Sequence, residues 1–312
     1  MGEPVFHHRP VLLEESLEAL AIREDGIYID CTYGRGGHSA AILAELGDRG
    51  CLIALDRDAD AVASALERFG EDPRFVIEHA SFDRLAEIAE RQDVAGAVNG
   101  ILLDLGVSSP QLDDARRGFS FMNEGPLDMR MDMNSGISAA EWLGEASETE
   151  IRDVLRNYGE ERFAGRIAHA VVMARQEAPL MTTLQLSKLV ERAVPRREKG
   201  KHPATRTFQA IRIRINRELE QLENVLAQSL DVLAPGGRLA VISFHSLEDR
   251  IVKRFFRKHS SPPKLPKGVP VMASEETTVL KLVGKSIAPS AQELATNPRA
   301  RSSRLRIAER TA

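Results

Sequence analysis

Short hydrophobic runs and amphipathic stretches alternate along the N-terminal third of the chain. The runs predict buried strands at 27–30, 51–56, 74–79 and 97–104. Before and between these runs, apolar residues recur at helical spacing, which predicts helices at 10–20, 59–69 and 82–91. Asp58 can cap the second of these helices. Alternation of this kind predicts an α/β fold with a doubly wound, mostly parallel, Rossmann-like sheet.

This alternation stops after residue 104. Residues 106 to about 136 are rich in Gly, Ser, Pro, Asp and Met, and the segment is too long for an ordinary strand–helix loop. Only helical patterns follow. A capping box at Ser147 opens a helix that ends near Gly159, and further helices are predicted at 160–177, 183–194 and 205–233. Residues 211–215 also alternate, so a strand remains open there, although the apolar stripe of the helix is longer.

The strand pattern resumes after Pro235-Gly236-Gly237. Strands are predicted at 238–244, 278–283 and 303–308, with a helix at 247–258 after the first of them. Because the sheet continues beyond the helical block, that block is an insertion and not a second domain in series. We therefore expect a helical domain at 115–210 inserted into a sheet domain made of 1–114 and 211–312.

A glycine-rich turn, Gly34-Arg35-Gly36-Gly37-His38, follows the first strand. A dinucleotide fingerprint would need Gly or Ala where Ser39 stands, and a phosphate-binding loop would need a Lys that is absent. The turn precedes a helix that His38 or Ser39 can cap. Asp30 and Asp56 end the first two strands, a pattern that suits S-adenosylmethionine (SAM), with Asp56 accepting hydrogen bonds from the ribose hydroxyls. A glycine turn without a ligand is the alternative.

Composition sets the broad class of the protein. Hydrophobic residues make up 43% and charged residues 28% of the 312 residues, as in a soluble globular protein. Cys31 and Cys51 both fall in predicted core strands, so they are expected to be buried thiols in a reducing compartment. No signal-like or membrane-spanning apolar run occurs, and no cluster has metal-ligand spacing. We expect a cytoplasmic protein without a metal.

Charge is distributed unevenly along the chain. Residues 1–150 carry 12 Lys and Arg against 30 Asp and Glu, whereas residues 151–312 carry 30 against 16. A basic second half points to a polyanionic partner such as a nucleic acid. The alternative is that it only balances the acidic half.

Eight motifs together give the chain a specific resemblance. They are Pro10–Glu14, Gly34–His38, Leu103–Asp113, Gly118–Phe121, Pro126–Asp132, His202–Ala210, Ser243–Arg250 and Asn297–Ser303. With these motifs the chain resembles the RsmH/MraW family over nearly its whole length. The family consists of SAM-dependent methyltransferases that modify N4 of a cytidine in 16S ribosomal RNA. The resemblance implies a class I SAM-methyltransferase sheet with an inserted all-helical domain.

The resemblance also implies a set of SAM contacts: Gly36, Gly37, His38, Asp56, Phe82, Asp104 and Gln111. The glycines would let the backbone approach the methionine part, and Phe82 would lie on the adenine face. Asp104 and Gln111 would lie where the methionine end meets the target base. Read without the resemblance, Phe82 is a core aromatic residue, His38 an exposed cap and Gln111 a polar loop residue.

Two routes to a methylated cytosine differ in the residues that they need. Methylation at C5 needs a cysteine thiolate, and neither cysteine lies in a suitable loop. The exocyclic amine N4 needs no covalent intermediate, only acceptors that orient its NH2 group. We expect Ser109 to orient N4 and Asp104 to assist. His245, after the fifth strand, is a candidate base or, equally, a hydrogen-bonded structural histidine.

A base inside a duplex could not reach such a site, so the target is expected to be single-stranded or extruded. The expected partner is 16S ribosomal RNA in the small ribosomal subunit, and a homodimer remains open. Candidate phosphate contacts are Arg196, Arg197, Lys199, Lys201, Arg206, Arg250, Lys253, Arg254, Arg257, Lys258, Arg299, Arg301, Arg304 and Arg306. Rival interpretations are a methyltransferase acting on DNA or a small molecule, a non-enzymatic RNA-binding factor and, less favoured, an NAD-dependent oxidoreductase.

Overall fold

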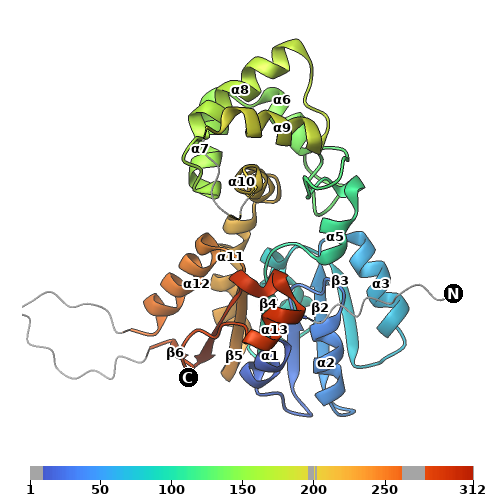
Figure 1. Cartoon of the computed structure of the whole chain (residues 1–312). Helices are drawn as coiled ribbons and strands as arrows, with labels where there is room; N and C mark the ends of the chain where they lie inside the picture. The colour runs from blue at the N-terminus through green and yellow to red at the C-terminus, as the bar shows by residue number, and fades with distance from the viewer. Residues whose placement is uncertain (1–9, 196–199, 201, 262–277, 312) are drawn as a thin grey trace, which may run out of the picture. The chain divides into compact units, whose positions relative to one another are not determined.

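The computed structural model describes residues 10–195, 200, 202–261 and 278–311. Two compact units are found. The sheet unit comprises Met1–Gly106 and Leu219–Ala312, and the helical unit comprises Val107–Glu218. Figure 1 shows both units and labels most of their helices and strands.

Among the described residues, the sheet unit holds one sheet with the strand order β3-β2-β1-β4-β5-β7-β6. The strands are β1 (Ile27–Asp30), β2 (Cys51–Asp56), β3 (Phe75–His79), β4 (Val98–Asp104), β5 (Leu233–Ser243), β6 (Leu280–Leu282) and β7 (Arg304–Arg310). β1 to β5 are parallel, and β7 runs antiparallel to both of its neighbours. The predicted fold class, a doubly wound and mostly parallel α/β sheet, is confirmed. Its order reverses between β1 and β4, where crevices for ligands form in such sheets.

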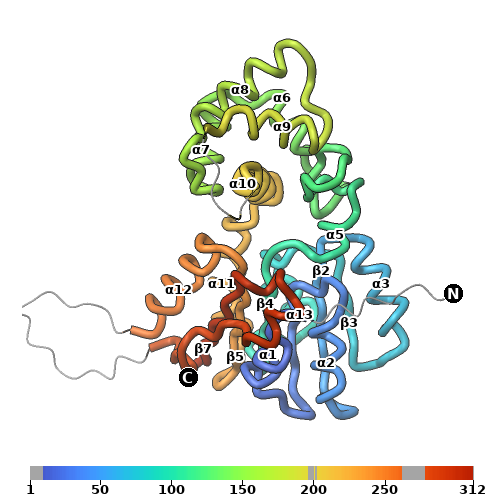
Figure 2. The backbone as a smooth tube through the Cα atoms, viewed as in Figure 1, coloured from blue at the N-terminus to red at the C-terminus, as the bar shows by residue number. Residues whose placement is uncertain are grey.

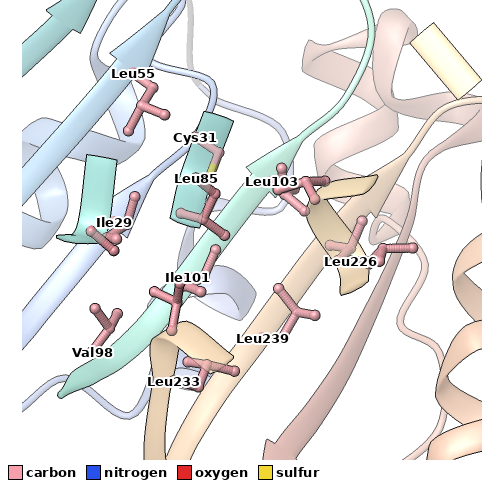
Figure 3. Packing of buried hydrophobic residues seen from close by; sticks show 14 of the residues in the cluster. Ile29, Cys31, Leu55, Leu85, Val98, Ile101, Leu103, Leu226, Leu233 and Leu239 are labelled. Atoms are coloured by element: carbon pink, nitrogen blue, oxygen red, sulfur yellow. The ribbon is translucent and has the colours of Figure 1, made fainter. Parts of the chain in front are cut away.

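Alternating side chains along the strands build a core on each face of this sheet. Ile29 and Ile101 belong to one buried cluster, which Figure 3 shows together with Leu85 and Leu226. Helices α4 (Leu85–Arg91), α11 (Glu218–Val232) and α12 (Ser246–His259) contribute to that cluster. Tyr28 and Leu102 point into the other cluster with residues of α1 (Leu13–Leu20), α2 (Gly37–Glu45) and α3 (Ala59–Phe69). Successive side chains of a strand point to opposite faces, so each strand contributes to both clusters, and helices cover both faces of the sheet.

Helices from the first and last parts of the described chain are hydrogen-bonded within the sheet unit. The Leu12 backbone N–H donates to Glu293 Oε1 at 2.8 Å, which ties the start of α1 to α13 (Ala291–Thr296). The short helix η3 (Pro298–Ser302) then leads into β7. Figure 2 follows the backbone through this region, with α13 next to α1.

Helices make up most of the helical unit: α5 (Ser109–Asp113), η2 (Ala115–Arg117), α6 (Ala139–Glu145), α7 (Glu148–Gly159), α8 (Ala164–Glu177), α9 (Thr183–Ala193) and α10 (Thr205–Asn216). The Ser147 side chain caps α7, as predicted, by accepting the Glu150 N–H. The unit starts earlier than the expected residue 115, because Val107 and Leu112 pack against its core. It also ends later than residue 210, because Asn216 accepts the Met131 N–H and donates to Met129 O.

A single helix at 205–233 is wrong. α10 ends at Asn216, Arg217 takes a left-handed conformation with φ of 53°, and α11 begins at Glu218. The Asn216 side chain forms hydrogen bonds with the backbone of Met129 and Met131, which hold the chain in place between the two helices. The apolar stripe continues through both helices, so periodicity alone does not reveal the break. A strand at 211–215 is excluded as well, because these residues lie in α10.

Candidate functional site

The functional residues predicted in the first part of the chain come from the carboxyl ends of neighbouring strands. Asp30 ends β1, Asp56 ends β2 and Asp104 ends β4. β1 lies between β2 and β4, and Asp30 is in register with Leu102. Because parallel strands present their carboxyl ends at one edge, the three acids share the edge at which the strand order reverses.

The glycine turn lies at the same edge. A Cβ on Gly36 would lie 2.4 Å from Tyr33 Oη, and one on Gly37 would lie 2.2 Å from Pro10 Cγ. Both distances are too short for any side chain. The helix α2 starts at Gly37 with Gly36 as its N-cap, so the expected capping by His38 or Ser39 is wrong. Ser39 lies inside the helix and donates to Asp30 Oδ2 at 2.6 Å instead.

Asp56 faces this turn. Its Oδ2 accepts the Gly34 N–H at 2.7 Å and its Oδ1 accepts the Asp58 N–H at 2.8 Å. Burial raises the pKa of Asp56 to about 6, although the two backbone donors act in the opposite direction. Each oxygen accepts one backbone N–H and keeps a lone pair for a further donor, such as a hydroxyl.

Phe82 opens the short helix η1 (Phe82–Arg84) after β3. Its ring is partly buried and packs against the core cluster on the α4 side of the sheet. Phe82 therefore contributes to the core, as an aromatic residue at a helix start commonly does, and the ring is not completely enclosed.

Asp104 is the most unusual of the acids. Its side chain is 26% exposed, yet Oδ1 is buried and has no hydrogen-bond partner among the described residues. Burial raises the pKa of Asp104 well above its ordinary value, and the charges of Asp30 and Glu248 raise it further. A buried acceptor without a donor is costly, which marks Asp104 as a place where a ligand can supply one.

Asp30 and His38 are more deeply enclosed. Asp30 is 1% exposed, and burial raises its pKa while hydrogen bonds from Ser39 and Thr32 oppose the shift. His38 is also buried, so its interpretation as an exposed cap is wrong. Its Nε2 lies 3.2 Å from Val11 O, and its Nδ1 lies 3.7 Å from Asp104 Oδ2.

His245 is held by the helix that follows it. Its Nδ1 accepts the Glu248 N–H at 3.3 Å, while Glu248 Oε2 accepts the N–H groups of Phe244 and His245. This reciprocal capping box uses the nitrogen lone pair that a base would need. The geometry therefore favours the structural role of His245 over the catalytic one.

Glu248 was missed by the sequence reasoning. It is 2% exposed and acts on the pKa of Asp104, so it belongs to the acidic group at the strand ends. The spacing of His245 and Glu248, three residues apart at a helix start, is the signal that could have revealed it.

Ser109 and Gln111 belong to the helical unit. Both lie in α5, where Gln111 Oε1 accepts the Ser108 N–H at 3.0 Å as part of a capping box. Gln111 is buried and Ser109 is partly buried. Their roles toward a ligand remain predictions.

The candidate phosphate contacts differ in how available they are. Five on α12 are exposed, as are three near η3: Arg250, Lys253, Arg254, Arg257, Lys258, Arg299, Arg301 and Arg304. Arg306 is engaged with both oxygens of Asp249, at 2.7 and 3.0 Å. Arg206 donates to Glu160 O. The other four, Arg196, Arg197, Lys199 and Lys201, lie outside the described residues.

No group of three or more His, Cys, Asp or Glu within the described part of the chain could hold a metal ion. None of the helices in that part is long and apolar enough to cross a membrane.

A doubly wound sheet with a tight glycine turn after β1 and buried acids at its strand ends is typical of the α/β proteins that bind nucleotide-like cofactors. A family model described as the MraW methylase family matches residues 5–311, so the chain belongs to this family and is a methyltransferase. The chain is 59% identical over 312 residues to "Ribosomal RNA small subunit methyltransferase H" of Thioalkalivibrio sulfidiphilus (strain HL-EbGR7). The alignment covers 100% of this chain and 99% of that protein.

Solved structures are less similar. A putative rRNA-methylase from Clostridium thermocellum has a TM-score of 0.46 and 11% identity, covering 96% of this chain and 98% of that one. An rRNA methylase from Streptococcus thermophilus has a TM-score of 0.43 and 12% identity, covering 99% and 100%. The assignment rests on the family model and on the relative with 59% identity.

Proposed function

We propose that the protein transfers a methyl group from SAM to the exocyclic N4 amine of a cytidine in 16S ribosomal RNA of the small ribosomal subunit. The observation that carries this proposal is the relative with 59% identity over the full length, whose name specifies small-subunit ribosomal RNA. The family resemblance indicates that the methyl acceptor is the N4 amine, and the residues at the strand ends suit both the methyl donor and this acceptor.

The sheet unit offers groups suited to each part of the donor. Gly36 and Gly37 pack so closely against Tyr33 and Pro10 that a Cβ would clash, so this turn keeps the bare backbone that close approach of a ligand requires. Asp56, oriented by two backbone N–H groups, is suited to ribose hydroxyls, and Phe82 to the adenine face. When bound, SAM supplies a methyl group already activated on a positively charged sulfur. The acids Asp30, Asp104 and Glu248 suit that charge.

The raised pKa values of both cysteine thiols favour an amine over a ring carbon as the methyl acceptor. Burial raises the pKa of Cys31 well above its ordinary value, and the Asp30 charge raises it further. Burial also raises the pKa of Cys51. A thiolate is therefore disfavoured at both positions, and a thiolate is what attack at the C6 position of a pyrimidine would require.

Holding and orienting the amine is the task of the acceptors near the strand ends. The Asp104 carboxyl, whose side chain is 26% exposed, can accept one N–H of the target NH2 group. We assign to Ser109 of the helical unit a second contact to that group. Alignment of the amine with the methyl group lowers the activation barrier, by roughly several kcal/mol in well-oriented reactions.

RNA binding is assigned to the exposed cations of α12 and the η3 region. The apolar face of α12 is buried through Val252 and Phe256, which leaves its Lys and Arg side chains on the solvent side. Contacts of such cations with phosphates release counterions, so binding weakens steeply with salt. The target cytidine is expected to be single-stranded or extruded.

The test is methyl transfer from tritiated SAM to small ribosomal subunits, to protein-free ribosomal RNA and to DNA, followed by mass spectrometry of the labelled nucleosides. We expect N4-methylcytidine in ribosomal RNA. Label only in DNA, or only at C5, would contradict the proposal. Absence of SAM binding in calorimetry would favour a non-enzymatic RNA-binding factor.

A further inference from the structure

His38 and Asp104 form a pair behind the proposed acceptor position. They come from different elements, α2 and the end of β4, and His38 Nδ1 lies 3.7 Å from Asp104 Oδ2. The His38 side chain is 7% exposed and the Asp104 side chain is 26% exposed. Asp104 is thus the member that a substrate can reach, and the imidazole lies on its protected side.

The contact of His38 Nε2 determines the tautomer of the neutral imidazole ring. Val11 O can only accept, so Nε2, at 3.2 Å, carries the proton of the neutral ring. Nδ1 then presents its lone pair on the side of Asp104 Oδ2. At 3.7 Å the two atoms are within ion-pair distance, so an imidazolium has a counterion in the carboxylate, and an approach by a few tenths of an ångström would let Nδ1 accept a carboxyl proton from Asp104.

The charges around this pair are negative. Asp30 at the end of β1 and Glu248 at the start of α12 both act on Asp104, and His245 contacts Glu248. Two neighbouring carboxylates make uptake of a proton by the pair favourable. Proton exchange at such a site belongs to the pair and not to one residue.

We propose that His38 is a positioning residue that shares with Asp104 the proton released by the acceptor amine. This inference rests on the proposed function. Methyl transfer forms one C–N bond and breaks the donor C–S bond, whose electron pair returns to sulfur. The amine nitrogen then gives up one N–H proton, its bonding pair stays on nitrogen, and the proton passes to Asp104 and is shared with His38 Nδ1.

His38→Gln is the informative variant, because its side-chain amide can still donate to Val11 O but has no titratable nitrogen facing Asp104. We expect kcat to fall roughly tenfold or more, consistent with the loss of part of a general-base contribution. The acid limb of the pH–rate profile should move to lower pH, a change that the loss of a cofactor contact alone would not produce.

His79→Gln is the matched control. His79 Nε2 also contacts a backbone carbonyl, that of Arg57 at 3.1 Å, but His79 is exposed and faces solvent at the end of β3. Its kcat and pH profile should equal those of wild type. If His38→Gln weakens only cofactor binding and keeps the wild-type kcat and profile, His38 is a cofactor contact alone and the proposal is overturned.

A second measurement does not depend on turnover. In 15N NMR spectra of the cofactor-free protein, the neutral His38 ring should be the Nε2–H tautomer, and its titration midpoint should fall in Asp104→Asn. An Nδ1–H tautomer, or a midpoint unchanged in Asp104→Asn, would overturn the pair. Wild-type protein that binds SAM but methylates no RNA would instead refute the proposed function, and the NMR result would still stand.

Discussion

Asp56→Asn tests whether a buried charge at the end of β2 opposes folding in the absence of a ligand. The pKa of Asp56 rises from 3.8 to about 6 in the folded protein, mainly because of burial. The folded state therefore binds a proton more readily than the unfolded state does. Unfolding free energy must then decrease as pH rises through this interval.

The size of the effect follows from the shift. Two pKa units correspond to about 3 kcal/mol, which wild type should lose between pH 4 and pH 7 through this group. The Asn variant lacks this loss. Asn also offers only one acceptor to the N–H groups of Gly34 and Asp58, which costs about 1–3 kcal/mol at every pH. Only the pH-dependent part of the difference is diagnostic.

Urea unfolding of the cofactor-free protein at pH values from 4.5 to 8 measures this difference. The only tryptophan, Trp142, lies in the helical unit, so its fluorescence follows the unfolding of that unit. Far-UV circular dichroism follows both units, and a transition that it shows without a fluorescence change belongs to the sheet unit. Asp231→Asn, at an exposed carboxylate of α11, controls for the loss of one charge. A wild-type-minus-variant difference that is constant with pH would refute the buried-charge explanation.

The same variant should bind the cofactor worse. Loss of a charged acceptor for the ribose hydroxyls should weaken S-adenosylhomocysteine binding by roughly 1.5–3 kcal/mol, about ten- to a hundredfold in Kd, by calorimetry at pH 8. Equal affinity in wild type and Asp56→Asn would remove Asp56 from the ribose site.

Three further changes test other parts of the structure. Gly37→Ala places a Cβ 2.2 Å from Pro10 Cγ and should cost about 1–3 kcal/mol of stability and at least tenfold in S-adenosylhomocysteine affinity. The control Gly144→Ala, whose Cβ would have nothing within 4 Å, should be neutral or stabilising. Denaturation measures the stability of both variants and calorimetry their affinity. Lys253→Glu with Arg257→Glu should weaken RNA binding and flatten its salt dependence in filter-binding titrations, and an unchanged slope would exclude α12 from the phosphate interface. Asn216→Ala leaves the Met131 N–H without its acceptor and should destabilise the helical unit by about 2–4 kcal/mol in urea, detected by tryptophan fluorescence; a loss below half of that would show that the 129–131 loop does not depend on this side chain.

The sheet could be predicted because its parallel strands contain short apolar runs, and runs that end on an acid place that acid at the carboxyl edge of the sheet. Asp30, Asp56 and Asp104 were therefore identified from local sequence. The glycine turn could be recognised too, although Gly36 and not His38 is the N-cap of the helix: Gly36 takes a left-handed conformation with φ of 67°, and a side chain there would clash with Tyr33.

Features that depend on distant partners could not be predicted. The break at Arg217 is fixed by contacts of Asn216 with residues 129–131, more than 80 positions away. The burial of His38 depends on its fit between Val11 and Asp104, which no local pattern encodes. The influence of Glu248 on Asp104 likewise arises only when α12 packs beside β5, the strand that pairs with β4.

The division of the chain has a consequence for its synthesis. The helical unit is one continuous stretch, whereas β4 must wait for β5, whose first residue follows more than a hundred positions later. On the translating ribosome the helices can therefore pack while the edge of β4 is still open. We expect the nascent chain to expose that unpaired edge until residue 243 has emerged, which is the interval in which it most needs protection from aggregation.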